Sequence, residues 1–208
     1  MSYTKIIILA LSLALVYACY LLAGKHPAEE AAVSKGQEVY ENILTRASVR
    51  DFQDKAVSDA QIDSLLHAGM AAPTAADKRP WHFVVITDRQ LLDQLAAINP
   101  HATFLKVAPL VIVVCGDMNK TLEGEAREFW VQDASAASEN ILLAAHAMGL
   151  GAVWTGGYPS KDRCEAMARV LSLPDNLVPL NAIVIGYPAK DVQPKDKWDK
   201  SNVTYHTR

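Results

Sequence analysis

The hydrophobic residues of this chain recur with two different periods, which separate predicted helices from predicted strands. Apolar positions three or four residues apart predict helices at residues 37–46, 58–70, 88–95, 125–148 and 161–171. Short apolar runs predict strands at residues 82–87, 108–116 and 181–187. Residues 151–158 indicate only a short buried segment and a turn. Because helices and strands mix without strict alternation, the pattern favours an α+β fold over a doubly wound sheet.

Local signals support several of these elements. Ser58 and Gln61 form a capping box, in which each side chain hydrogen-bonds the backbone of the other residue. Asp88 is a second helix-capping residue. The uninterrupted apolar run at residues 110–114 predicts a strand that is buried on both faces. The repeating positions of helix 125–148 are mostly small, so another helix can approach it closely, and we predict a central, packed helix.

The N-terminal segment is strongly apolar. Residues 6–23 form an uncharged run about as long as a short membrane span. Within it, Val16-Tyr17-Ala18-Cys19 is similar to a bacterial lipobox, although the chain stays apolar for four residues past the cysteine. Residues 24–35 are small, polar and charged, as in a linker.

These features predict three segments, namely a signal or membrane anchor at residues 1–24, a linker at 25–36 and one domain at 37–208. We expect a membrane-associated protein of a bacterium, attached by an uncleaved N-terminal helix or by a lipidated Cys19. Lys5 and Lys25 flank the apolar run, so the side of the membrane stays open. The polar tail after residue 188 has no core of its own, and a partner subunit is one candidate to cover it.

Composition narrows the class of protein. The chain has 208 residues, of which 50% are hydrophobic, and a formal net charge of −3. Its near-neutral charge argues against nucleic-acid binding. The cysteines Cys19, Cys115 and Cys164 lie far apart and form no CxxC motif, and the six histidines are scattered. We therefore predict no disulfide framework and no metal site, with Cys115 as a buried small hydrophobe.

The first candidate binding segment is Arg46-Ala47-Ser48-Val49-Arg50, where a predicted helix ends. Two guanidinium groups flank a hydroxyl group, and residues 46, 48 and 50 share one face if the chain is extended. Arginine presents a planar fork of donors that fits a phosphate group. The alternative is that these cations only interact with the negative end of the helix dipole.

Three further stretches carry polar or small residues in suggestive places. Residues 72–81 form a loop of small and polar residues that ends at Trp81. Residues 149–159 surround a short apolar piece with glycines, which permits a flat ligand to approach the backbone. Residues 194–198 hold two lysines that either complete a phosphate site or solvate the tail. The alternative interpretation of residues 72–81 is an ordinary surface loop, and that of residues 149–159 is a turn. No GxGxxG dinucleotide fingerprint is present.

In this order the stretches resemble the flavin-dependent nitroreductase family over about residues 39–205. The matching pieces also include Asp51-Phe52, Ala136-Ala137, residues 140–145 and Ile185-Gly186-Tyr187-Pro188. The resemblance implies a nitroreductase-like α+β fold with a central, mostly antiparallel sheet flanked by helices. It also implies a homodimer that binds FMN at the subunit interface, with two sites per dimer.

The family pattern implies these FMN-binding residues: Arg46, Ser48, Arg50, Pro73, Thr74, Asp77, Trp154, Thr155, Gly156, Gly157, Lys195 and Lys197. The two arginines would hold the phosphate and ribityl chain, the two lysines would meet the phosphate, and Ser48 would contact the polar edge of the ring. Pro73 and Thr74 would come from the other subunit and cover the ring. Residues 154–157 would line the ring, with a backbone N–H group near flavin N5.

Two residues depart from the family pattern. Asp77 stands where the family often has Asn, and Arg79 stands where it often has Gln. An ionised Asp can only accept hydrogen bonds, whereas Asn can also donate them. The Asp77 contact is therefore expected only if it meets the flavin N3–H group or pairs with a base.

The resemblance implies an enzyme in which NAD(P)H reduces the flavin and departs before an acceptor enters, which is a ping-pong mechanism. Nitroaromatics, quinones or related compounds are the expected acceptors, and no catalytic acid or base is evident. Residues 117–130 are the expected lid, where Phe129 and Trp130 either stack on substrate or pack in the core. The alternatives are other flavin chemistry on this fold, namely reductive dehalogenation or flavin destruction, and a membrane-tethered flavin-binding protein without reductase activity.

Overall fold

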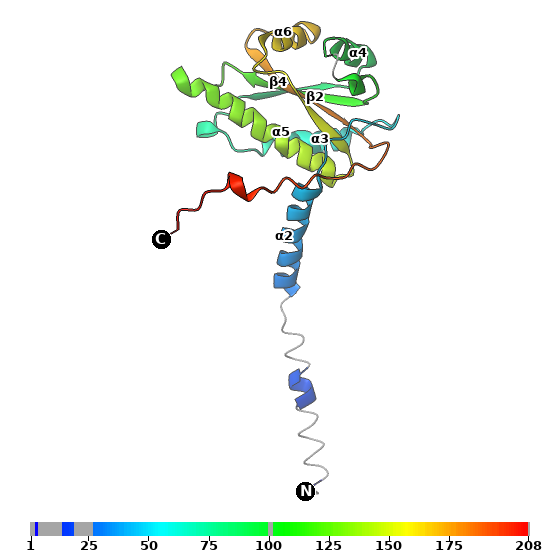
Figure 1. The fold of residues 1–208 in the computed structure, drawn as a ribbon, viewed down its shortest axis with the longest axis vertical. Helices are drawn as coiled ribbons and strands as arrows, with labels where there is room; N and C mark the ends of the chain where they lie inside the picture. Colours follow the sequence, from blue (N-terminus) through cyan, green and yellow to red (C-terminus); the bar gives the residue numbers. More distant parts are fainter. Residues whose placement is uncertain (1–2, 4–13, 19–26, 100–101, 208) are drawn as a thin grey trace. The chain divides into compact units, whose positions relative to one another are not determined.

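The computed structural model describes residues 3, 14–18, 27–99 and 102–207 (Figure 1). The chain divides into two units, Met1–Glu41 and Asn42–Arg208. Helix α2 (Pro27–Thr45) belongs to both units and ends one residue before the predicted end. It begins earlier than predicted, because residues 28–32 are alanine and glutamate, which are strong helix formers. Most of the predicted linker is therefore helical.

The predicted membrane anchor is mostly outside the described residues, and so is Cys19. Residues 14–18 of this segment have helical backbone. Within the part of the chain that the structure describes, no helix has both the length and the apolar character needed to cross a membrane.

Four strands in the described part of the second unit form one antiparallel sheet in the order β1-β2-β4-β3. They are β1 (Trp81–Ile86), β2 (Leu110–Asp117), β3 (Gly151–Gly156) and β4 (Leu177–Gly186). Every residue of β2 is buried, which confirms the prediction from its uninterrupted apolar run. The antiparallel sheet likewise confirms the predicted α+β class. Residues 151–156, which the pattern indicated only as a buried segment, form a strand.

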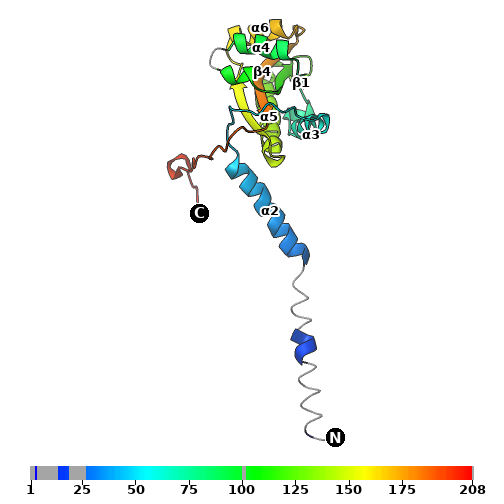
Figure 2. The ribbon, with the colours of Figure 1, turned by 90° about the vertical axis from the view of Figure 1, so that its right-hand side faces the viewer.

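Helices cover both faces of this sheet (Figures 1 and 2). They are α3 (Asp59–Met70), α4 (Arg89–Ala97), α5 (Phe129–Ala147) and α6 (Lys161–Val170). On one face, Leu92 of α4 and Met167 of α6 share a core cluster with Val113. On the other face, Leu65 of α3 and Ile141 of α5 belong to a second core cluster. The sheet is thus the middle layer of three.

Helix boundaries follow the predicted caps where caps exist. Ser58 and Gln61 form the complete capping box at the start of α3. Asp88 accepts a hydrogen bond from the Leu91 amide at 2.8 Å at the start of α4. Helix α5 starts at Phe129, four residues later than predicted, because η3 (Gly124–Glu128) is a 3-10 turn. Met70, the last residue of α3, is 51% exposed, although the apolar spacing of the helix predicts that it faces the core.

Three more short turns complete the unit: η1 (Ala75–Asp77), η2 (Thr103–Lys106) and η4 (Lys200–Asn202). Cys115 is fully buried in β2, as predicted for a small hydrophobe. Burial raises the pKa of the Cys115 thiol to about 12. Burial also raises the pKa of the Cys164 thiol. Neither cysteine is therefore a candidate nucleophile.

Candidate functional site

The segment at residues 46–50 follows α2 and lies along the edge of β3. The Val49 amide donates a hydrogen bond to the Ala152 carbonyl at 3.0 Å, and Ser48 forms a parallel bridge with Ala152. Val49 is buried, Ser48 is half-buried and Arg50 is exposed. The backbone is therefore fixed to the sheet while the polar side chains on either side of Val49 stay accessible.

Gly151 is required by this arrangement, and Gly151→Ala should destabilise the protein. A Cβ atom at position 151 would lie 2.7 Å from the Cβ of Val49, which is closer than such carbons approach. We expect a loss of about 1–3 kcal/mol in the free energy of unfolding, measured as a lower melting temperature. Gly156→Ala in the same strand is the matched control, because nothing lies within 4 Å of its new Cβ atom. Equal melting temperatures for the two variants would contradict the predicted clash.

A cavity of about 230 Å³ opens beside Arg46. It lies among the end of α2, the end of α5, the start of β3 and the segment at residues 188–192. Apolar lining residues include Val49, Leu142, Leu150 and Ala152. The charged or titratable lining residues are Arg46, His146, Lys190 and Asp191. A cavity lined by apolar and cationic side chains suits a ligand that joins a carbon skeleton to an anionic group.

The polar groups around this cavity are already paired with one another. The side chain of Arg46 is 18% exposed, and its Nε atom lies 3.6 Å from Glu139 Oε1. Lys190 Nζ lies 2.9 Å from Asp51 Oδ2. His146 Nε2 and Thr45 Oγ1 are hydrogen-bonded at 2.9 Å. Partial burial and then the charge of Arg46 lower the pKa of His146, so the neutral imidazole predominates at neutral pH.

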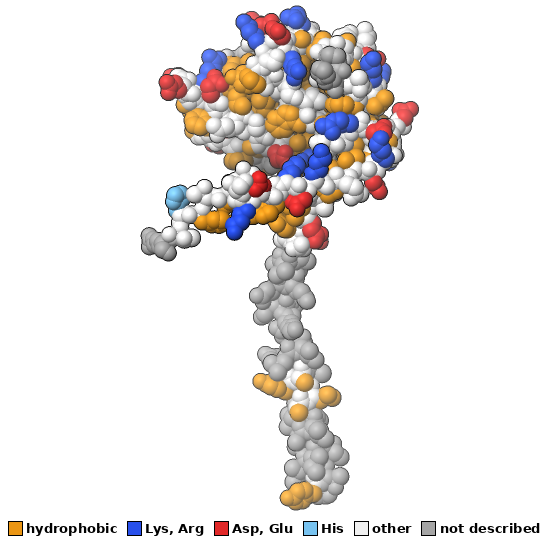
Figure 3. Space-filling view, viewed as in Figure 1, with side chains coloured by type: hydrophobic (Ala, Val, Ile, Leu, Met, Phe, Trp, Pro, Cys, Tyr) orange, Lys and Arg blue, Asp and Glu red, His pale blue; other side chains and the backbone are white. Residues whose placement is uncertain are grey.

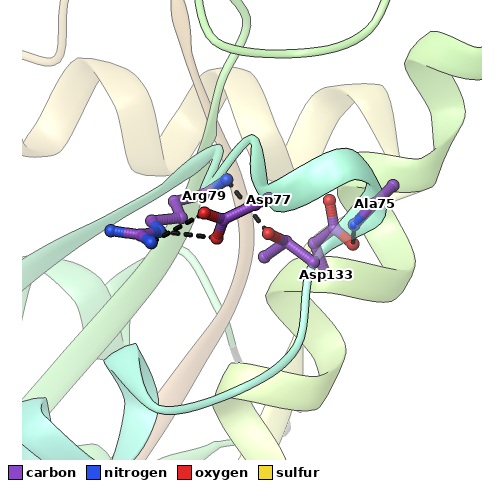
Figure 4. A network of polar contacts seen from close by, with 5 residues as sticks. Ala75, Asp77, Arg79 and Asp133 are labelled. Carbon is purple, nitrogen blue, oxygen red and sulfur yellow. Dashed lines mark hydrogen bonds and ion pairs between the residues drawn. The ribbon is translucent and has the colours of Figure 1, made fainter.

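The loop at residues 71–80 packs against the first half of α5. The Ala75 amide donates to the buried carboxylate of Asp133 at 2.9 Å (Figure 4). Thr74 Oγ1 accepts from the Arg79 amide at 3.2 Å, while the preceding Pro73 is exposed. The loop is therefore anchored at its centre and exposes predicted ring-covering residues.

Asp77 and Arg79 form a bidentate ion pair in this loop. Arg79 Nε and Nη2 each donate to a carboxylate oxygen of Asp77 at 2.7 Å (Figure 4). The hydrogen bonds from Arg79 hold the pKa of Asp77 below its usual value. Thus the acid pairs with a base, one of the two conditions expected for it. Ala76, Asp77 and Arg79 also have φ values of 49°, 53° and 50°, a left-handed conformation that non-glycine residues rarely adopt. Such strain often accompanies a functional loop.

Within one chain, the two groups of predicted site residues lie near different parts of α5. The loop contacts Asp133, whereas Arg46 contacts Glu139 and lies beside His146. At 1.5 Å per residue, Asp133 is about 9 Å from Glu139 and about 20 Å from His146 along the helix. Pro73 and Thr74 are not among the residues that line the cavity beside Arg46.

The end of β3 holds the predicted ring-lining residues. Trp154 and Thr155 are half-buried, and Thr155 Oγ1 donates to the Ala182 carbonyl at 3.0 Å. Gly156 is exposed, with open space where a side chain would begin. Gly157 is buried, and a Cβ atom there would collide with Met167. The exposed glycine gives a flat ligand access to the backbone at this point.

The predicted lysines of the tail do not reach the cavity in the described structure. Lys195 and Lys197 are exposed and belong to an extended segment (Figure 1). Lys190 lines the cavity instead. Basic and acidic side chains are interspersed on the face shown in Figure 3.

The two aromatic residues at the start of α5, Phe129 and Trp130, differ in how deeply they are buried. Trp130 is 3% exposed and packs edge-on against Tyr158, with ring centroids 4.9 Å apart. Core packing, the alternative interpretation, therefore describes Trp130. Phe129 is 44% exposed and stays a candidate for substrate contact. Tyr158 also donates to Glu128 Oε2 at 3.1 Å, and this bond raises the pKa of the tyrosine.

Sequence reasoning missed His146, Lys190 and the pair of Tyr158 and Glu128. A titratable residue in the otherwise apolar stretch at residues 141–148 is the signal that could have found His146. Lys190 carried no comparable signal, because its place depends on how the tail folds back over Asp51.

Comparisons with known proteins agree with this architecture. The sequence pattern of the nitroreductase family matches residues 43–103 and 99–187. A Methanothermobacter thermautotrophicus protein assigned as an NADH dehydrogenase/NAD(P)H nitroreductase is 45% identical, over 84% of this chain and 89% of its own length.

Solved structures show the same similarity. A Parabacteroides distasonis protein with the same assignment is 46% identical, with a TM-score of 0.77 over 82% of this chain and 99% of that one. An FMN-dependent nitroreductase from Clostridium difficile is 27% identical, with a TM-score of 0.73 over 80% of this chain and 98% of that one. The family pattern and these relatives span most of the second unit, and the chain belongs to the nitroreductase family.

Proposed function

We propose that this protein is an FMN-dependent oxidoreductase that uses NAD(P)H to reduce nitroaromatics, quinones or related acceptors by a ping-pong mechanism. The observation that carries this proposal is the segment at residues 46–50, fixed along β3 beside a cavity with cations at its rim. The names of the relatives support the cofactor and the donor.

Several described residues have the chemistry that FMN requires. Arg46 and Lys190 would hold the phosphate, and Ser48 would offer a hydroxyl group to the ribityl chain or ring edge. Gly156 leaves open space for a flat ring, since nothing lies within 4 Å of a Cβ atom built there. Arg50 is exposed beside this strand and can supply positive charge to the same ligand.

We propose a homodimer with FMN at its interface. Within one chain, Pro73 and Thr74 are exposed or half-buried and do not line the cavity beside Arg46. A second copy can supply Pro73 and Thr74, so that each site takes its cations from one subunit and its cover from the other. The exposed lysines Lys195 and Lys197 are free to approach the phosphate in that assembly, as the family pattern implies.

When FMN is bound, its ring supplies the hydride chemistry, accepting from NAD(P)H and delivering to the acceptor. The protein itself would bind the cofactor and orient it. Arg46 and Lys190 would fix the phosphate, and Arg50 would help to stabilise negative charge in the site. Exposed Phe129 offers an aromatic face for planar acceptors. Solvent can supply protons.

Reductive dehalogenation of an amino acid is less well supported. In the expected lid, Lys120 is paired with Asp117 at 3.3 Å. The connection at residues 117–127 also has no tyrosine. Product analysis would separate this chemistry from nitro and quinone reduction.

The test of the proposed function is a visible absorption spectrum of the purified full-length protein, before and after NADPH or NADH is added without oxygen. A flavin spectrum that bleaches supports the reductase and identifies its donor. Flavin that does not bleach with either nicotinamide rules out the NAD(P)H reductase and favours the tethered flavin-binding protein. No flavin, even after FMN is added, contradicts the assignment of the site.

We also propose that residues 1–24 attach the protein to a membrane, which the uncharged run at residues 6–23 supports. The wild-type protein should sediment with membranes and resist a carbonate wash, whereas a variant lacking residues 1–24 should be released. Cys19→Ser separates the two modes of attachment. If this substitution releases the protein, a lipid on Cys19 is the anchor. If the substitution has no effect, an uncleaved helix is the anchor. A wild-type protein found only in the soluble fraction refutes both.

A further inference from the structure

His146 is a polar residue of the cavity beside Arg46 to which the proposed function assigns no role. It lies in the last turn of α5, where a positive charge is stabilised by the negative end of the helix dipole. Its ring is half-buried, lines the cavity and is held by the hydrogen bond to Thr45 at 2.9 Å. An imidazole in this place is oriented and accessible to a ligand in the cavity.

The permanent cations of the cavity already face carboxylates. Arg46 lies 3.6 Å from Glu139 of α5, and Lys190 lies 2.9 Å from Asp51. Asp191 also lines the cavity, from the segment that carries Lys190. A phosphate must compete with these carboxylates for both cations. Among the residues that line the cavity, His146 is the one whose positive charge can appear near neutral pH.

We propose that His146 binds the phosphate of FMN and takes up a proton as it does so, which makes FMN affinity depend on pH. This inference rests on the proposed function, because it requires the FMN phosphate to enter the cavity beside Arg46. His146 is then a binding residue in addition to those that the family pattern implies.

The direction of the pH dependence follows from the charges around His146. In the free protein, burial first and the charge of Arg46 second lower the pKa of His146, and the ring is neutral at neutral pH. A phosphate of charge about −1.5 to −2 favours the protonated ring. Binding therefore takes up a proton, and affinity should rise as the pH falls from the pKa of His146 in the bound state to its lower pKa in the free state. Protonation of the phosphate itself, near pH ~6, opposes this trend.

The experiment measures the affinities of the full-length apo-protein for FMN and for riboflavin by fluorescence quenching, between about pH 8 and about pH 6. Riboflavin lacks the phosphate, so the ratio of the two affinities isolates the phosphate contribution. As the pH is lowered over this range, we expect the ratio of FMN to riboflavin affinity to rise about three- to tenfold more in the wild type than in His146→Gln. One linked proton changes an affinity by at most about tenfold per pH unit.

Two further variants complete the design. His146→Lys carries a permanent positive charge, so its ratio should stay high without the wild-type rise. His67→Gln is the matched control, because His67 is exposed on α3, away from the cavity, and its ratio should follow the wild type. Melting temperatures and riboflavin affinities, which we expect to be unchanged, verify that the variants are folded.

Equal pH dependence in the wild type and in folded His146→Gln overturns the inference while leaving the flavoprotein intact. If His146→Gln does not fold, the wild type is compared with His146→Lys. The inference is overturned if the ratio of FMN to riboflavin affinity is independent of pH in both proteins. Equal affinity for FMN and riboflavin at every pH shows that no phosphate enters the cavity, which also overturns it. Absence of flavin binding at every pH overturns the proposed function itself and the inference with it.

Discussion

Arg46→Ala should weaken FMN binding by about tenfold to 150-fold, or ~1.5–3 kcal/mol, because it removes a charge-assisted contact to the phosphate. The side chain is 18% exposed and lines the cavity, so packing holds the guanidinium in place before the ligand arrives. Fluorescence titration of the apo-protein measures this loss. Riboflavin binding should change little, because riboflavin carries no phosphate.

Glu139→Gln is the control for this prediction. It removes the ion pair at 3.6 Å but keeps Arg46, so it separates loss of the phosphate contact from loss of the contact with α5. We expect FMN affinity in Glu139→Gln to be equal to or higher than in the wild type, because Arg46 no longer has a competing carboxylate. An equal loss in both variants would assign the effect to packing, and unchanged affinity in Arg46→Ala would refute the phosphate contact.

Most of the fold could be predicted because its elements carry local signals. The capping box at Ser58, the cap at Asp88 and the buried run of β2 each fix one element without reference to the rest of the chain. Strand β3 was not predicted as a strand because the segment is short, is rich in small residues and ends at Gly156. Helix α5 was extended too far back because apolar periodicity does not distinguish a 3-10 turn from a helix.

The candidate site was harder to predict, because its residues meet through tertiary structure. The expected pairing of Asp77 with a base is found in Arg79, since both residues lie in one short loop. Lys190 and His146 meet at the cavity only because the tail folds over the end of α5, and no local pattern encodes this. Trp130 could not be assigned from sequence, because a shift of one residue, about 100° around the helix, decides whether an aromatic ring faces the core or the solvent.

Subunits with complementary defects should restore about one quarter of the FMN sites when they are mixed. Arg46→Ala damages the cation half of a site, and Pro73→Arg places a bulky charge in the half that we assign to the other subunit. Pro73 is exposed, so the second variant should fold. Random exchange makes half of the dimers mixed, and each mixed dimer has one site built from two undamaged halves.

The experiment denatures and refolds equal amounts of the two variants together, and then measures bound FMN and NAD(P)H-dependent turnover. Each variant refolded alone should show little of either. Arg46→Ala mixed with Arg50→Ala is the matched control. Both changes lie in the same half, so no mixed dimer contains an undamaged site and no recovery is expected.

Recovery in the first mixture but not in the second requires that each site takes its two halves from different chains. We expect this outcome because Pro73 and Thr74 do not line the cavity beside Arg46 within one chain. No recovery in either mixture, despite exchange shown by tagged subunits, would mean that one chain builds its site alone.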